Sequence, residues 1–271
     1  MSIGKSRRKQ MSRREALGAM GGVGAAFLVG CASNGISSVD GGGSNTGADA
    51  AAAGAVDQGS AGAVDAGTLD CVVTPSETEG PFFVDENLNR SDITTGTTEA
   101  FVVNGMPMTL AFYVYQVSGK TCTPLSGAQV DVWHASAEGA YSDEASGMIQ
   151  SKSTVGEKYL RGYQLTDANG LVNFTTIYPG WYMGRTIHIH FKVRTFAAGA
   201  KTYEFTSQVF IDDAINDIVL NQAPYNTRGN RSVRNANDMV FGSGAGSLQM
   251  NVQALGGGAS YAGAFSIGLN I

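Results

Sequence analysis

The strongest constraint on the fold is a repeated alternation of apolar and polar residues, in short stretches that turn-forming residues separate. Such alternation places every second side chain on the same face of an extended strand. It is clearest in residues 108–117, 128–134, 171–177, 187–193 and 203–211. Long helical periodicity is absent, and only residues 212–220 favour a short helix. Short amphipathic strands bury their apolar faces against one another, so the chain predicts an all-β fold with a single β-sandwich.

Two further segments have the composition of hairpins. Asp167-Ala168-Asn169-Gly170 separates the apolar runs 163–165 and 171–174, and Asn and Gly tolerate the positive φ angles of tight turns. Near the end of the chain, residues 247–254 and 260–271 flank three consecutive glycines. Both segments are predicted to form strand pairs.

The N-terminus has the features of an export signal. A basic cluster that includes Arg13 and Arg14 precedes a weakly apolar run from residue 16 to residue 30, too short and glycine-rich to span a bilayer. The arginine pair resembles a twin-arginine signal, and the end of the run resembles the lipobox of bacterial lipoproteins. We expect residues 1–30 to be a signal peptide and Cys31 to carry a lipid. The protein would then be exported and anchored to a bacterial membrane through Cys31 alone, facing the periplasm or the cell surface; a free cysteine after an ordinary signal is the alternative.

Residues 31–69 consist almost entirely of small and polar residues, without aromatic residues or apolar periodicity. This composition predicts a flexible, disordered tether, so the folded domain should occupy residues 70–271. Cys71 and Cys122 remain as an even pair in a chain sent to an oxidising compartment. We expect them to form a disulfide; two free thiols or a metal pair are the alternatives, although no CxxC spacing is present.

Charge narrows the class of partner. The net charge is -5 and the isoelectric point is about 5.2, with positive residues scattered beyond the N-terminal cluster. Beyond the N-terminus, the sequence lacks the clustered Lys and Arg residues typical of nucleic-acid binding, which favours a small-molecule partner.

The chain has only three histidines, and two of them, His188 and His190, alternate with apolar residues inside a predicted strand. Positions i and i+2 of a strand face the same way and lie about 6.6 Å apart, so both imidazoles can converge on one metal ion. Taken alone, the pair is equally consistent with two hydrogen-bonded structural histidines.

Three segments around this pair resemble the intradiol catechol dioxygenases in order and spacing: VDVWHASAEGAY (residues 130–141), YPGWY (178–182) and RTIHIHF (185–191). The segment TPSETEGPFF (74–83) is similar to the start of the catalytic domain in that family, and YNTRGNRSVRNANDMVF (225–241) resembles a tail of some relatives. The main resemblance covers residues 74–213.

The resemblance implies a non-haem iron(III) ion held by Tyr141, Tyr182, His188 and His190, and a catechol-type substrate that reacts with O2 to a cis,cis-muconate-type dicarboxylate. Phenolate is a hard, strongly donating anion that suits iron(III), which in turn deprotonates the phenol.

The same resemblance assigns roles to single residues. Tyr182 would be the ligand that leaves when substrate binds, Arg185 would lie beside the substrate, and Gln208 would lie beside that arginine. His134 matches a position that relatives do not use as a ligand, so we expect a structural role or one behind the ligands.

Alternatives remain at this point. The helical dimerisation segment of the catechol-type enzymes has no counterpart before residue 70, which leaves a homo-oligomer open. A non-catalytic exported surface-binding β-sandwich would keep the histidines as structural residues. A cupin-like metal protein would need a glutamate soon after the pair, and residues 191–201 contain none; zinc is disfavoured because two tyrosines are poor zinc ligands.

Overall fold

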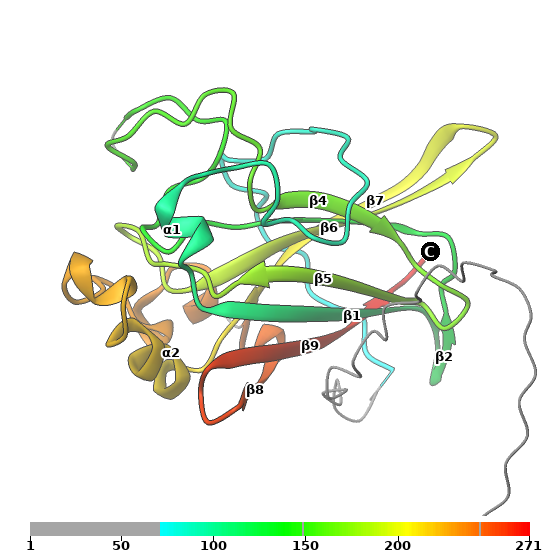
Figure 1. The fold of residues 1–271 in the computed structure, drawn as a ribbon. Helices are drawn as coiled ribbons and strands as arrows, with labels where there is room; N and C mark the ends of the chain where they lie inside the picture. The colour runs from blue at the N-terminus through cyan, green and yellow to red at the C-terminus, as the bar shows by residue number, and fades with distance from the viewer. Residues whose placement is uncertain (1–70, 148, 244) are drawn as a thin grey trace, which may run out of the picture. The chain divides into compact units, whose positions relative to one another are not determined.

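The computed structural model describes residues 71–147, 149–243 and 245–271, which form two β-sheets with few helices (Figure 1). The predicted signal peptide, the tether and Cys31 lie outside the described residues. No helix within the described ranges is long and apolar enough to cross a membrane.

The first sheet is built around the long strand β1 (Pro107–Ser118). β9 (Ser260–Leu269) pairs with β1 in parallel and with β8 (Asn251–Leu255) antiparallel. β2 (Thr121–Pro124) and β5 (Leu171–Ile177) pair antiparallel with different halves of β1.

The second sheet is fully antiparallel, in the order β4-β3-β6-β7. Its strands are β4 (Arg161–Leu165), β3 (Gln129–Trp133), β6 (His188–Ala197) and β7 (Ala200–Phe210).

Strand β6 has one apolar face and one polar face. Ile189 and Phe191 belong to the main core, where the ring of Phe191 lies 5.5 Å from that of Phe112 on β1. The alternate residues His188 and His190 face away from this core, because successive side chains of a strand point to opposite faces. The candidate site therefore lies on the outer face of the second sheet and not between the two sheets.

The outer face is covered by the chain segment that leads into the domain. Lys192 of β6 pairs with Glu79, and Arg194 pairs with Asp85 and with Asp131 of β3. Because Lys192 and Arg194 are almost fully buried, their partners compensate the cost of removing both charges from water.

The predicted strands form, with small shifts at their ends. The expected helix is α2 (Asp213–Leu220), and the side chain of Asp212 caps it by accepting a hydrogen bond from the backbone of Ala214. The structure adds β2 and five short helices that the sequence pattern did not predict: α1 (Ala100–Val103), η1 (Tyr225–Arg228), η2 (Asn235–Asn237), η3 (Phe241–Ser243) and η4 (Ala245–Leu248).

Two sequence expectations are wrong. The turn at residues 167–170 forms, but β4 and β5 on either side of it belong to different sheets and do not pair as a hairpin. Residues 247–250 are not part of a strand, because Leu248 is buried in η4 and the backbone of Met250 bonds to Phe210 at the end of β7. In both places long-range pairing outweighs the local pattern.

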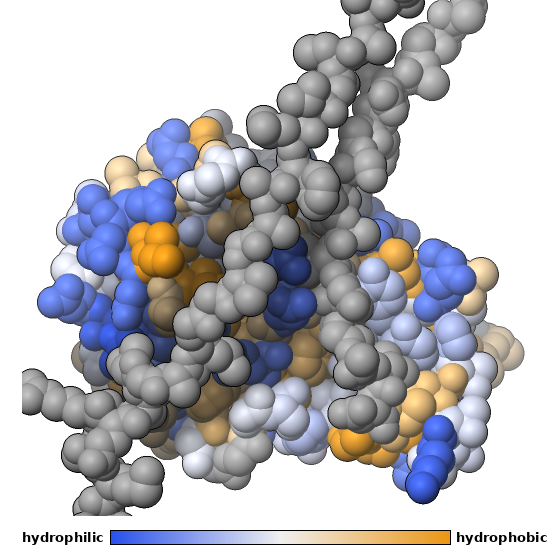
Figure 2. All heavy atoms as spheres, turned by 90° about the horizontal axis from the view of Figure 1, so that it is seen from below, coloured by the Kyte–Doolittle hydropathy of each residue, from blue (hydrophilic) through white to orange (hydrophobic). Residues whose placement is uncertain are grey.

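Seen from below, the surface carries many hydrophilic side chains at the end that bears α2, with some apolar side chains among them (Figure 2). Beside the first sheet, a groove of about 420 Å³ is lined by residues of β1, β8 and β9 and by residues 71–75 and Cys122. It lies on the opposite sheet from the two histidines.

Cys71 and Cys122 form a disulfide in the structure, across 51 positions of the sequence. The bond joins the first described residue of the domain to β2.

Replacing both Cys71 and Cys122 with serine should lower the free energy of unfolding by roughly 2 to 4 kcal/mol, because the cross-link restricts the unfolded chain. Urea unfolding of the oxidised wild type and the double variant measures this difference. Reductant should reproduce the loss in the wild type and leave the variant unchanged. Equal stability of the two oxidised proteins would contradict the prediction.

Candidate metal centre

Two loops and one strand supply the four expected ligands. His188 and His190 lie at the start of β6, Tyr182 lies in the loop before it, and Tyr141 lies in the loop after β3. Gly180 brings the two loops together, because a Cβ atom there would lie 2.4 Å from the carbonyl oxygen of Ala137. Only glycine permits this approach, so the YPGWY turn packs directly on the loop that carries Tyr141.

The four side chains converge on a single atom, Nε2 of His188. It lies 3.1 Å from Tyr182 Oη, 3.1 Å from His190 Nε2 and 3.5 Å from Tyr141 Oη. Nδ1 of His188 lies 2.7 Å from the carbonyl oxygen of Thr186, which can only accept a hydrogen bond. Nδ1 therefore carries the proton, and the lone pair of Nε2 faces the other three side chains.

This arrangement fits a metal ion better than a hydrogen-bond network. One lone pair accepts one good hydrogen bond, yet four polar atoms, including Nη1 of Arg185, lie within 3.5 Å of it in a buried site. The ring of His190 stacks on Trp133 at 4.9 Å, and its Nδ1 has no hydrogen-bond partner among the described residues. Stacking thus fixes the plane of the ring, and Nε2 faces the cluster. No group of three or more His, Cys, Asp or Glu that suits a metal occurs in the described ranges, so the tyrosines complete the candidate ligand set.

Burial keeps all four side chains neutral when no cation is bound. It lowers the pKa of His188 to about 3, with a further contribution from the charge of Arg185, and it lowers the pKa of His190 well below the usual value. Burial also raises the pKa of Tyr141 well above 10, and it raises that of Tyr182 while Arg185 opposes the shift. A trivalent cation reverses this balance for the two tyrosines, because it favours their phenolate forms, and it binds the imidazoles in the neutral form that burial already favours.

Arg185 lies at the edge of the cluster, with Nη1 3.5 Å from His188 Nε2. Its Nη2 donates to Gln208 Oε1 at 2.6 Å, and Gln208 donates to the carbonyl oxygen of Thr78 at 2.7 Å. Gln208 faces His190 directly across the β6–β7 pair, which explains why a strand position so far along the chain reaches the site.

Three residues that the sequence pattern did not single out also belong to the site. Phe82 stacks on Tyr141 with ring centroids 4.3 Å apart, and a Cβ atom at Gly80 would lie 3.3 Å from a ring carbon of His190. Asp238 accepts a hydrogen bond from Arg185 Nε at 2.8 Å. A signal for Asp238 was present, since it is the single acidic residue of the segment 225–241.

His134 does not join the four converging side chains. It is fully buried, with Nδ1 2.9 Å from the carbonyl oxygen of Ala135 and Nε2 2.7 Å from Thr176 Oγ1. Both nitrogens are thus used by a neutral ring, and burial lowers the pKa of His134 to about 4. These contacts favour a structural role.

A family model described as "Dioxygenase" matches residues 78–221, more than half of the chain. The chain belongs to the intradiol ring-cleavage dioxygenase family. It is therefore a ring-cleaving dioxygenase, which favours catalysis over the non-catalytic surface-binding alternative. Enzymes of this family generally depend on non-haem iron(III).

Solved structures agree with this assignment. An intradiol ring-cleavage dioxygenase from Tetranychus urticae is 28% identical over 74% of this chain and 95% of its own, with a TM-score of 0.62. The dioxygenase domain of a dioxygenase carbohydrate-binding protein fusion from Streptomyces sp. SirexAA-E is also 28% identical, over 74% of this chain and 99% of its own, with a TM-score of 0.52. No significant match is found among curated protein sequences.

A more distant structure, the 3-chlorocatechol 1,2-dioxygenase from Rhodococcus opacus 1CP, shares the fold alone. It is 18% identical over 73% of this chain and 72% of its own, with a TM-score of 0.50.

The buried neutral His134 predicts a pH dependence of stability for the metal-free dioxygenase. The folded-state pKa lies below the unfolded value of 6.5, so this contribution is present above pH 6.5 and is lost as the pH falls toward 4. Between these limits the free energy of unfolding of the wild type should fall by roughly 3 kcal/mol more than that of the variant His134→Gln. This figure follows from about 1.4 kcal/mol for each pH unit between the two pKa values. Urea unfolding at pH 7, 5.5 and 4 measures both. The same loss in both proteins would show that His134 is protonated in the folded state.

Proposed function

We propose that this dioxygenase binds one non-haem iron(III) ion through Tyr141, Tyr182, His188 and His190 and cleaves a catechol-type ring with O2. Cleavage between the two hydroxyl-bearing carbons would give a cis,cis-muconate-type dicarboxylate. The observation that carries the proposal is the convergence of two phenol oxygens and a second imidazole within 3.5 Å of His188 Nε2. When bound, iron(III) supplies Lewis acidity and withdraws electron density from the catecholate ring.

The two tyrosines have different surroundings, which supports different roles. Tyr141 is held face to face against Phe82, 4.3 Å away, in a fully buried position. Tyr182 meets Phe82 only edge-on at 6.0 Å, and the next residue, Met183, is 59% exposed. Tyr182 therefore has the less restrained side chain. It is the proposed ligand that leaves and accepts one proton from the catechol.

Arg185 provides the fixed positive charge of the proposed mechanism. Its side chain is only 12% exposed. A charge in this position, beside the ligand cluster and with little competing water, stabilises negative charge that develops on the substrate ring. Gln208 holds one end of the guanidinium and is proposed as a positioning residue.

We also propose that the protein is exported and lipid-anchored through Cys31. The support is the sequence of the basic, apolar and lipobox-like segments that end at this residue. Mass spectrometry of the mature N-terminus tests it: a lipid-modified Cys31 supports the anchor, and an unprocessed or unmodified N-terminus contradicts it.

The purified protein should contain about one iron per chain and show a visible tyrosinate-to-iron(III) band that shifts when catechol is added. Tyr182→Phe should retain part of the iron and lower kcat by about 100-fold or more, because the proposed proton acceptor is lost. Tyr203→Phe is the matched control, since Tyr203 lies on β7 outside the cluster, and its kcat should equal that of the wild type.

Each part of the proposal has a contrary result. A protein that stays colourless after iron(III) reconstitution would contradict the iron-tyrosinate centre. A coloured protein in which Tyr182→Phe turns over catechol at the wild-type rate would contradict the role of Tyr182 alone. A coloured protein without ring-cleaved product from any catechol would contradict the substrate class.

A further inference from the structure

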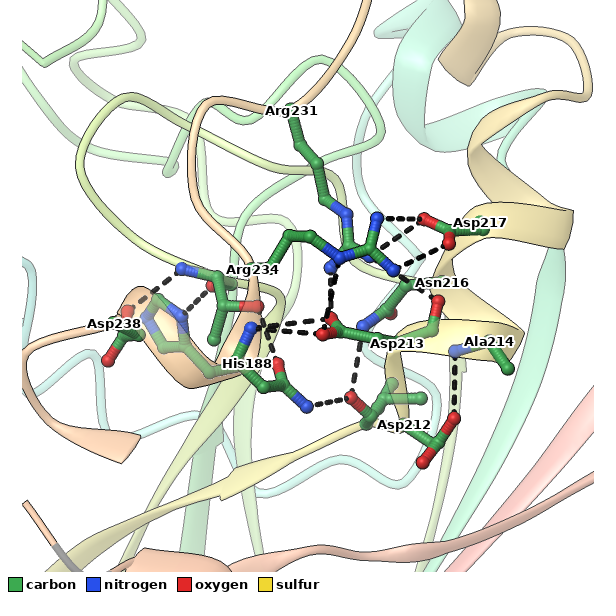
Figure 3. Close-up of polar contacts among 12 residues, drawn as sticks. His188, Asp212, Asp213, Ala214, Asn216, Asp217, Arg231, Arg234 and Asp238 are labelled. Carbon is green, nitrogen blue, oxygen red and sulfur yellow. Dashed lines mark hydrogen bonds and ion pairs between the residues drawn. The ribbon is translucent and has the colours of Figure 1, made fainter. Parts of the chain in front are cut away.

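The segment 225–241 follows α2 and lies beyond the end of the family-model match at residue 221. Basic residues tie it to the helix: Arg231 pairs with Asp213 and Asp217, and Arg234 pairs with Asp217 (Figure 3). Asn235 adds a hydrogen bond from its side chain to the carbonyl oxygen of Ile211 at 2.9 Å. These contacts fix the position of the segment before it reaches the candidate centre.

Asp238, at the end of this anchored stretch, has a fully buried side chain. Its Oδ2 accepts hydrogen bonds from Arg185 Nε and from the backbone of Thr186, both at 2.8 Å. Its Oδ1 accepts from the backbones of Val240 at 2.9 Å and Phe241 at 3.0 Å. Every close partner of the carboxylate is thus an N–H donor. A neutral amide in its place would have to direct an NH₂ group at donors on one side.

The guanidinium of Arg185 is held on two of its three nitrogens. Asp238 accepts a hydrogen bond from Nε and Gln208 accepts one from Nη2. Nη1 therefore points toward His188, 3.5 Å from its Nε2. Because a guanidinium is a rigid planar fork, two fixed nitrogens determine the direction of the third. The contact from Thr186 to Asp238 also fixes the backbone whose carbonyl oxygen orients His188.

We propose that Asp238 is a positioning residue that directs the charge of Arg185 toward the bound substrate. The inference rests on the proposed function, in which Arg185 lies beside that substrate. Asp238 has no hydrogen bond to any of the four candidate ligands and would act through Arg185. The segment 225–241 is on this basis a part of the active site and not only a surface extension.

A double-mutant cycle on the full chain tests the proposal, with catechol as the substrate. Asp238→Asn should lower kcat/KM by about 10- to 100-fold, because Arg185 loses its charged partner. In an Arg185→Gln background, the same change should have less than about a two-fold effect, because there is no guanidinium left to position. Asp85→Asn is the matched control, since it also removes a carboxylate that pairs with an arginine, Arg194, without contacting Arg185 or the segment 225–241, and it should stay within about two-fold of the wild type.

A measurement that does not depend on activity accompanies the cycle. The Nε–H resonance of Arg185 in the ¹⁵N spectrum of the metal-free full chain, assigned by its absence in Arg185→Gln, should exchange slowly in the wild type and in Asp85→Asn. It should exchange rapidly in Asp238→Asn. If Asp238→Asn does not fold, Asp238→Glu replaces it, because it keeps the charge but displaces the carboxylate.

The results separate the two proposals. Equal losses from Asp238→Asn in both backgrounds, or a protected Arg185 resonance in that variant, would overturn the positioning role. If the wild type cleaves no catechol, the proposed function fails, and the Arg185 resonance alone decides whether Asp238 positions the arginine.

Discussion

The candidate centre depends on the two-faced character of β6. Ile189 and Phe191 pack in the core between the sheets, so the alternate residues His188 and His190 must face outward. A dense apolar core on one side of a strand is a rigid support for polar side chains on the other. The directions of the two imidazoles are therefore set by hydrophobic packing, and the loops with Tyr141 and Tyr182 need only close over them.

When those loops close, the four candidate ligands are buried without a charge to stabilise the phenolate forms of the tyrosines, and a bound cation would supply that charge. Water is excluded from the cluster, so the imidazoles resist protonation and the phenols resist ionisation. A buried arginine beside a cation site would add repulsion. Burial opposes ionisation of Asp238, yet hydrogen bonds from Arg185 and from backbone N–H groups hold the pKa of Asp238 below its usual value. The guanidinium of Arg185 thus faces the site, while the carboxylate of Asp238 keeps the net charge of the pair close to zero.

The covering segments come from two distant parts of the chain, one before β1 and one between α2 and β8. Phe82 and Gly80 precede the first strand, and Asp238 follows the last residue of α2 by 18 positions. The family-model match, residues 78–221, contains Phe82, the candidate ligands, Arg185 and Gln208 but not Asp238. The family-model match therefore covers the candidate ligands and Arg185. The charged partner of Arg185, Asp238, lies outside the matched residues.

The sequence alone determined the strands, because alternation is a local property that survives in any β-sandwich, and it placed His188 and His190 on one face for the same reason. Motif resemblance supplied Tyr141, Tyr182, Arg185 and Gln208 as candidates. Only the tertiary structure decided that the strands around residues 167–170 part into different sheets, that residues 247–250 leave the strand, and that Asp238 reaches Arg185. Each of these depends on contacts between positions far apart in the chain. A local sequence pattern does not show which distant segment will form the backbone hydrogen bonds or the ion pair.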